Sequence, residues 1–142
     1  MELNFSIAEL LASESAEIYK IKNTPTLSSI ENMVKLIFFV LQPLRDRLGK
    51  PVIITSGFRC PELNEKVGGK NTSQHLKGQA VDIKVNGCSA STLFEYIKNS
   101  NIPYDQLIEE YSNGNSWVHI SYNHLKCRRE AFVYYNGEYI KK

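Results

Sequence analysis

The chain of 142 residues is poor in cysteine. Its three cysteines, Cys60, Cys88 and Cys127, form neither a CxxC pair nor an even disulfide pattern. We therefore expect reduced thiols in a protein made in the cytosol, and no disulfide framework. The chain also lacks a strong charge of either sign. A net charge of +2 is too small to indicate a protein that binds nucleic acid.

Long hydrophobic runs are missing as well. The longest, residues 36–41, is far shorter than a membrane span, so we expect no membrane segment. Residues 1–6 contain neither a basic region nor a long apolar stretch, which predicts no signal peptide and a protein that is cytoplasmic as synthesised.

The length and composition are those of a soluble globular protein. A chain of 142 residues, 42% hydrophobic and 23% charged, is large enough to bury a core. It contains no repeat, linker or low-complexity segment, so we predict one compact domain over residues 1–142, and a monomer.

The most informative segment is residues 73–82, with the sequence SQHLKGQAVD. It places His75 and Asp82 seven residues apart with Gly78 between them, and His119 follows in a second strand-like run, residues 117–122. Two histidines and one aspartate, with a fourth position open to water, form a ligand set typical of a catalytic zinc site. We expect one zinc ion.

The residue pattern predicts how these groups meet. Residues 79–85 alternate and are rich in valine and isoleucine, which predicts a strand whose successive side chains point to opposite faces. Asp82 and His119 can then share a polar, concave face of a sheet. Gly78 permits a tight turn, so that His75 can fold back towards Asp82.

A hairpin is predicted between two strands, residues 104–111 and 117–122. The pair Asn113-Gly114 strongly favours a two-residue type I′ turn. With that turn Glu110 pairs with Trp117, and it lies on the same face as His119, diagonally displaced and within reach of a glutamate side chain or one water. A longer loop would shift the strand register and place Glu109, instead of Glu110, on the same face as His119.

Three blocks in the same order resemble a known family. They are the motif S-x-H-x-x-G-x-A-x-D at residues 73–82, the element Ser-Gly-Phe-Arg at residues 56–59, and Trp117-x-His119. Together they resemble the zinc D-alanyl-D-alanine carboxypeptidase family of peptidoglycan peptidases over about residues 4–125. That group includes D,D-dipeptidases, phage L-alanyl-D-glutamate endolysins and the metal-binding core of Hedgehog signalling domains.

The resemblance implies an α+β fold with a small central antiparallel sheet, helices packed on one side and a zinc site on the concave face. His75, Asp82 and His119 would bind zinc, and Arg59 would hold a substrate carboxylate or carbonyl oxygen and stabilise the oxyanion. Arg59 could instead be a structural ion-pair partner. The further expected substrate contacts are Ser73, Gln74 and Trp117, although Ser73 could orient a ligand and Trp117 could pack in the core.

The catalytic base departs from the family pattern. Many relatives carry an acid or a histidine three residues before the last zinc histidine, where this chain has Ser116. A nearby carboxylate must replace it, or the protein is inactive. The candidates are Asp105, Glu109 and Glu110, of which the hairpin register favours Glu110, with Glu109 as the alternative.

Two functions follow from these residues. The first is a zinc peptidase that cuts a D-amino-acid-containing bond in a peptidoglycan stem peptide, in an endolysin-like protein of phage or prophage origin that acts on the cell wall after release. The second is a non-catalytic zinc module that binds wall fragments or a protein partner. The residues do not decide between a D,D-carboxypeptidase and an L,D-endopeptidase.

The remaining elements are predicted from caps and periodicity. Capping-box patterns that begin at Ser6 and Ser28 predict the starts of two helices. The second helix should be kinked or split at Gln42, before Pro43, and should end at Gly49. We also expect a buried strand at 52–55, helices at 61–67 and from Ser89 or Ser91 to 99, and a C-terminal hairpin at about 131–141. His124 should lie on the surface, and Tyr134, Tyr135 and Tyr139 should pack across strands rather than form a glycan platform.

Overall fold

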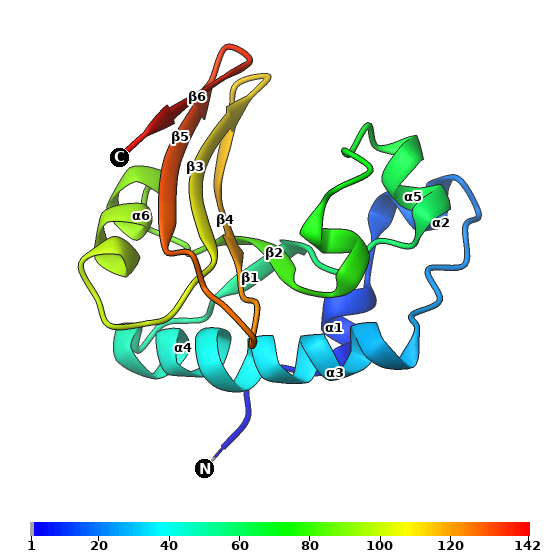
Figure 1. The fold of residues 1–142 in the computed structure, drawn as a ribbon, viewed down its shortest axis with the longest axis horizontal. Coiled ribbons are helices and arrows are strands. Elements are labelled where there is room, and N and C mark those ends of the chain that lie inside the picture. The colour runs from blue at the N-terminus through cyan, green and yellow to red at the C-terminus, as the bar shows by residue number, and fades with distance from the viewer. Residues whose placement is uncertain (1) are drawn as a thin grey trace.

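A computed structural model describes residues 2–142 as a six-stranded sheet flanked by helices (Figure 1). The strand order is β1-β2-β4-β3-β5-β6, and the sheet is mixed because β3 and β5 run parallel. The strands are β1 (Ile53–Ser56), β2 (Ala80–Lys84), β3 (Gln106–Ser112), β4 (Asn115–Ser121), β5 (Glu130–Tyr135) and β6 (Glu138–Lys141).

The expectation of an antiparallel sheet is therefore wrong for one pair of strands. One edge of β4 pairs with β2 and the other with β3, so β5 cannot pair with β4 and adds instead at the free edge of β3. Because the chain reverses direction between β4 and β5, β5 runs parallel to β3. The predicted strand at 52–55 is also more exposed than expected, since β1 lies at the edge of the sheet and pairs with β2 alone.

The predicted hairpin between β3 and β4 is confirmed in its register. Asn113 and Gly114 both have positive φ, at 50° and 78°, as a type I′ turn requires. Glu110 pairs with Trp117, and Ile108 pairs with His119. A second Asn-Gly turn, at residues 136–137, joins β5 to β6.

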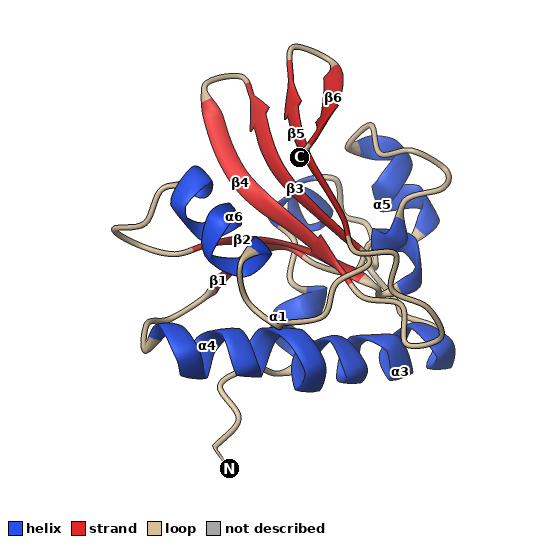
Figure 2. Cartoon of the chain, turned by 60° about the vertical axis from the view of Figure 1, so that its left-hand side comes forward, coloured by secondary structure: helices blue, strands red, loops and turns tan. Residues whose placement is uncertain are grey.

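A helical rod from Leu27 to Leu48 packs beneath the sheet (Figures 1 and 2). It comprises α3 (Leu27–Leu36), a π-helical turn η1 (Ile37–Leu41) and α4 (Gln42–Leu48). The helix does not split at Gln42, because the wide π turn directly before Pro43 accommodates a residue that lacks a backbone N–H. Gly49 ends it in the left-handed conformation, as predicted.

The N-terminal cap of this rod lies two residues earlier than expected. Thr26 and Ser29, rather than Ser28 and Glu31, exchange side-chain and backbone hydrogen bonds in a reciprocal box. By contrast, Ser6 caps α1 (Ile7–Leu11) as predicted, accepting a hydrogen bond from the backbone N–H of Glu9.

The rod is long and apolar enough to cross a bilayer by length and composition alone. Its apolar side chains are nevertheless part of the domain core. Five of them have no exposed surface: Met33, Leu36, Val40, Leu41 and Leu44. We interpret the rod as a core helix of this fold, and the absence of a membrane segment stays a prediction.

Helices lie on both sides of the sheet, not on one side. Helix α6 (Ala90–Lys98), capped by Ser89, contacts β3 and β4 on the apolar face, where Val81, Val118 and Ile120 are buried. Helix α5 (Pro61–Lys66) and the short 3₁₀ turn η2 (Gln74–Lys77) lie across from it, beside the polar face (Figure 1). The space between η2 and this polar face contains the candidate site.

Candidate metal centre

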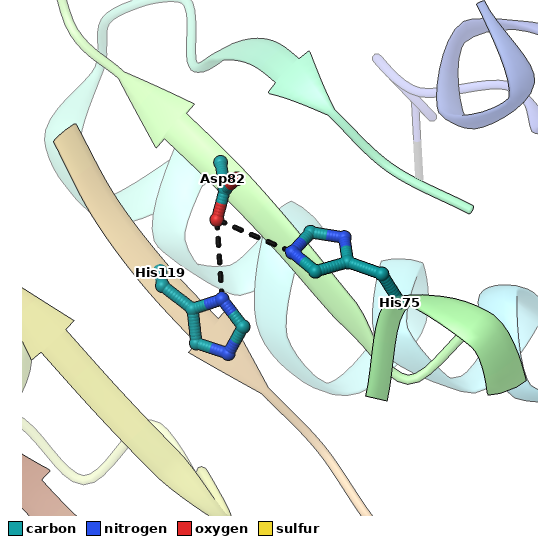
Figure 3. A group of neighbouring side chains, drawn as sticks. All are labelled: His75, Asp82 and His119. Carbon is teal, nitrogen blue, oxygen red and sulfur yellow. Dashed lines mark hydrogen bonds and ion pairs between the residues drawn. The ribbon is translucent and has the colours of Figure 1, made fainter. Parts of the chain in front are cut away.

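Three predicted ligand residues meet on the polar face of the sheet (Figure 3). Asp82 and His119 are directly opposed on β2 and β4, and His75 reaches them from η2. One donor atom from each residue lies within 4.8 Å of the other two. The alternation of the two strands and the turn at Gly78 therefore bring the three side chains together as the sequence predicted.

The carboxylate of Asp82 is the centre of this cluster. Its Oδ1 lies 3.1 Å from Nδ1 of His119 and 3.4 Å from Nε2 of His75. Two imidazole nitrogens and one carboxylate oxygen are donors that suit zinc, and three protein ligands leave a fourth position for water or substrate. The donor set thus fits one zinc ion of the catalytic type.

The orientation of His75 is fixed by a backbone carbonyl that the sequence did not identify. Nδ1 of His75 lies 2.7 Å from the carbonyl oxygen of Gly57, so Nδ1 donates its proton there and Nε2 faces Asp82. Such an outer hydrogen bond holds a ligand imidazole in the correct tautomer.

Glycine is required at position 57 by close packing. A Cβ at Gly57 would lie 2.2 Å from the carbonyl oxygen of Leu10, which also accepts a hydrogen bond from the backbone N–H of Phe58. The backbone at Gly57 therefore lies directly against α1, and a side chain there would displace the carbonyl that holds His75.

We expect Gly57→Ala to lower zinc affinity about 10- to 100-fold, because His75 loses its oriented partner. Zinc titration against a competing chelator measures this change. The melting temperature of the metal-free variant controls for general damage, and a variant that binds zinc as tightly as the wild type would show that the Gly57 carbonyl does not position His75.

The pKa shifts of His75 and Asp82 favour metal binding, whereas that of His119 opposes it. Burial lowers the pKa of His75, which keeps its imidazole neutral. Burial alone would raise the pKa of Asp82, but the hydrogen bond from His119 opposes it, and that pKa lies well below its usual range. Burial also disfavours a charged His119, yet its hydrogen bond to Asp82 raises its pKa. A metal must therefore displace a proton from His119.

A groove of about 760 Å³ opens over the cluster. Besides the three candidate ligands, its lining includes the residues predicted to act on substrate: Arg59, Ser73, Gln74, Glu110 and Trp117. A cleft of this size, with a few convergent polar groups at its floor, is typical of a substrate site.

Arg59 is free to contact a ligand in this groove. It forms no ion pair with any described residue, and its Nε is buried without a hydrogen-bond partner. Burial lowers the pKa of its guanidinium, which the charges of Asp82 and Glu110 oppose. The structural ion pair considered as the alternative is therefore not present in residues 2–142.

Glu110 is the one of the three candidate bases that lines the groove. Its Oε1 lies 3.8 Å from Nδ1 of His119, and burial together with the charge of Asp82 raises the pKa of its carboxyl to about 6. Glu109 points to the opposite face and accepts a hydrogen bond from the Tyr111 hydroxyl. Asp105 is held by Arg128.

Ser116 does not face the cluster. Strand alternation places it on the face opposite Trp117 and His119, and it does not line the groove. An acid at this position of a regular β4 would therefore point away from the candidate ligands. The presence of serine at position 116 therefore does not prevent a carboxylate of β3 from acting as the base.

The remaining predicted residues occupy different positions. Ser73 accepts a hydrogen bond from the backbone N–H of His75 at 3.2 Å, which orders η2. Gln74 donates to Asp105 at 2.9 Å, and Nε1 of Trp117 is buried without a partner in the described chain. His124 is exposed, as predicted, and lies outside the cluster.

The chain belongs to the Peptidase M15 family, whose model matches residues 3–121. It is also similar to the zinc D-Ala-D-Ala carboxypeptidase of Streptomyces albus G, with 29% identity over 82 residues. That alignment covers 57% of this chain and 32% of the relative, so the chain spans about a third of the relative's length.

Proposed function

We propose that this protein is a zinc-dependent peptidase that hydrolyses a D-amino-acid-containing bond in the stem peptides of bacterial peptidoglycan. The observation that carries this proposal is the groove in which His75, Asp82 and His119 meet Glu110 and Arg59, in a chain of the M15 family. The name of the carboxypeptidase relative supports the metal and the substrate class.

The metal would be held by Nε2 of His75, a carboxylate oxygen of Asp82 and Nδ1 of His119, the atoms that face one another in the cluster. When bound, zinc supplies a Lewis acid that lowers the pKa of water to about 7 and polarises a carbonyl. The low pKa of Asp82 and the neutral state of His75 keep two of the ligands in the form that binds.

Glu110 would act as the general base. Its carboxylate stands beside the ligand cluster, from which it can take the proton of the attacking water and later pass it to the leaving amine. Arg59 would hold a substrate carboxylate or the developing oxyanion through its planar fork of N–H donors. Trp117 would form a wall of the groove.

The role of Glu110 predicts a pH dependence. A general base works only when it is ionised, so we expect kcat/KM to fall as the pH drops through the pKa of Glu110, which is about 6 in the metal-free site. A zinc-loaded protein should show this acid limb at or below that pH, because a nearby cation favours the carboxylate. A rate profile that stays flat from pH 7 to about pH 4 would contradict the assignment.

The direct test is digestion of purified peptidoglycan, with mass spectrometry of the products. We expect new fragments from zinc-loaded protein, none after chelation, and their return when zinc is restored. The fragment masses distinguish a D,D-carboxypeptidase from an L,D-endopeptidase. A folded, fully zinc-loaded protein that yields no fragments would favour a non-catalytic zinc module. The phage or prophage endolysin-like origin stays a separate proposal.

A further inference from the structure

The groove continues across the sheet from the candidate ligands to the C-terminal hairpin. The strand pairing aligns Ile108 of β3 with His119 on one side and Phe132 on the other. It likewise aligns Glu110 with Trp117 and with Tyr134, which in turn pairs with Tyr139 of β6. Three of the four aromatic residues of the hairpin line the same groove as the ligand cluster: Phe132, Tyr134 and Tyr139.

The distance across this surface equals the length of several residues of an extended peptide. Neighbouring strands lie about 4.8 Å apart, so β5 lies roughly 10 Å and β6 roughly 14 Å from β4. An extended peptide rises about 3.3 Å per residue, so a chain laid across the strands would span about four residues between His119 and Tyr139. A dipeptide bound at the metal would not reach the hairpin.

The aromatic side chains present a partly open surface. Tyr134 and Tyr139 pack across the strands with ring centroids 4.8 Å apart, as the sequence predicted, but Tyr139 remains 48% exposed. Tyr135 points to the opposite face, where it contacts Tyr111. Tyr134 and Tyr139 therefore pack against each other across the strands and also line the groove.

One unpaired positive charge stands at this end of the groove. Nζ of Lys70, from the loop after α5, lies 4.8 Å from the centroid of the Tyr139 ring and pairs with no described carboxylate. Arg128 also lines the groove, but its guanidinium already contacts the carboxylates of Asp105 and Glu130. Of the cations that line the groove at this end, Lys70 is therefore the one without a carboxylate partner.

We infer that Phe132, Tyr134, Tyr139 and Lys70 form a subsite for an extended acidic peptide, several residues away from the bond that is cut. The inference rests on the proposed function for its peptide substrate. The hairpin residues lie outside residues 3–121, which the family model matches, whereas Lys70 lies within them. The subsite makes the length and charge of the peptide determinants of specificity.

Equilibrium binding tests the subsite without depending on turnover. The zinc-loaded Glu110→Gln protein is titrated calorimetrically with the pentapeptide L-Ala-D-Glu-L-Lys-D-Ala-D-Ala, with the same peptide carrying a carboxamide in place of the D-Glu carboxylate, and with N-acetyl-D-Ala-D-Ala. The readout is the ratio of dissociation constants between long and short peptides.

Introducing Tyr139→Ala into the Glu110→Gln protein is expected to reduce the preference for the pentapeptide over the dipeptide about tenfold, because a partly exposed aromatic contact is lost. Lys70→Met is expected to reduce the preference for the carboxylate over the carboxamide about threefold, the size of an exposed ion pair. Tyr135→Ala is the matched control, since it removes a tyrosine from the other face of the same hairpin.

Equal long-to-short ratios in the Tyr139→Ala and Tyr135→Ala proteins would overturn the subsite. Turnover by the wild type, measured separately, keeps the two proposals apart. Wild-type hydrolysis without any hairpin effect would leave the peptidase and remove the subsite. Hairpin-dependent binding without hydrolysis would leave the subsite and remove the peptidase.

Discussion

Replacing Glu110 with glutamine should reduce peptide hydrolysis by about 10³-fold, because a general base typically contributes between about 10² and 10⁴ in rate. The substitution keeps the size of the side chain and removes its ability to take a proton. Since Glu110 is not one of the three clustered donors, the variant should still bind one zinc ion. Turnover of the pentapeptide and zinc content per chain measure both halves of this result.

Glu109→Gln is the matched control for this experiment. Glu109 is the neighbouring residue on the same strand, but its carboxylate points away from the groove and contacts Tyr111. Its variant should turn over substrate at close to the wild-type rate. Undiminished hydrolysis by Glu110→Gln would rule out Glu110 as the base. No hydrolysis by wild type and variant alike, with zinc bound, would support a non-catalytic module.

Replacing His119 with alanine should lower zinc affinity by more than about 100-fold, because loss of an outer partner alone costs up to that factor. The variant leaves His75 and Asp82 with an incomplete donor set. Bound zinc should also stabilise the wild-type fold by about 2.7 kcal/mol when free zinc is 100 times its dissociation constant. At the same zinc concentration this stabilisation should fall below about 0.4 kcal/mol in the variant.

Chelator competition and thermal unfolding, each with and without zinc, measure these two effects. His124→Ala is the matched control, because His124 is an exposed histidine that lies outside the cluster. It should retain zinc and the zinc-dependent rise in melting temperature. A His119→Ala protein that binds zinc as tightly as the His124→Ala protein would place the metal elsewhere.

Local rules of strand geometry predicted the arrangement of the cluster. Alternation placed Asp82 and His119 on one face, and the Asn113-Gly114 turn fixed the register that puts Glu110 beside them. These rules act over a few residues, so they can be applied to a sequence directly. They were sufficient for Asp82 and His119, which lie on regular strands, while His75 lies on the 3₁₀ turn η2 that ends at Gly78.

Other features depend on contacts that no local pattern records. The carbonyl of Gly57 belongs to the backbone, and its partner His75 is 18 residues away, so no side-chain motif reveals their hydrogen bond. The parallel pairing of β5 with β3 has no turn signature, because it follows from which sheet edge remains free. Helix α2 (Glu14–Ile18) was not predicted, since its cap Ser13 is followed three residues later by Ala16 and forms no capping-box pattern.

The cap of the main helix shows a third reason. Ser28-x-x-Glu31 matches the capping-box pattern, but Thr26 and Ser29 form a reciprocal pair two residues earlier. Several serines and threonines close together in residues 24–29 offer alternative starts, and the capping-box pattern alone does not choose between them. Such uncertainty moves a helix end by two residues and leaves the site unchanged.

The location of zinc in a crystal of the zinc-loaded protein tests the central claim most directly. Anomalous diffraction recorded on both sides of the zinc absorption edge identifies the element and its position. We predict one zinc peak between Nε2 of His75, the carboxylate of Asp82 and Nδ1 of His119, beside Glu110 in the groove. A zinc peak on other residues, or none at this cluster in protein shown to contain zinc, would contradict the account.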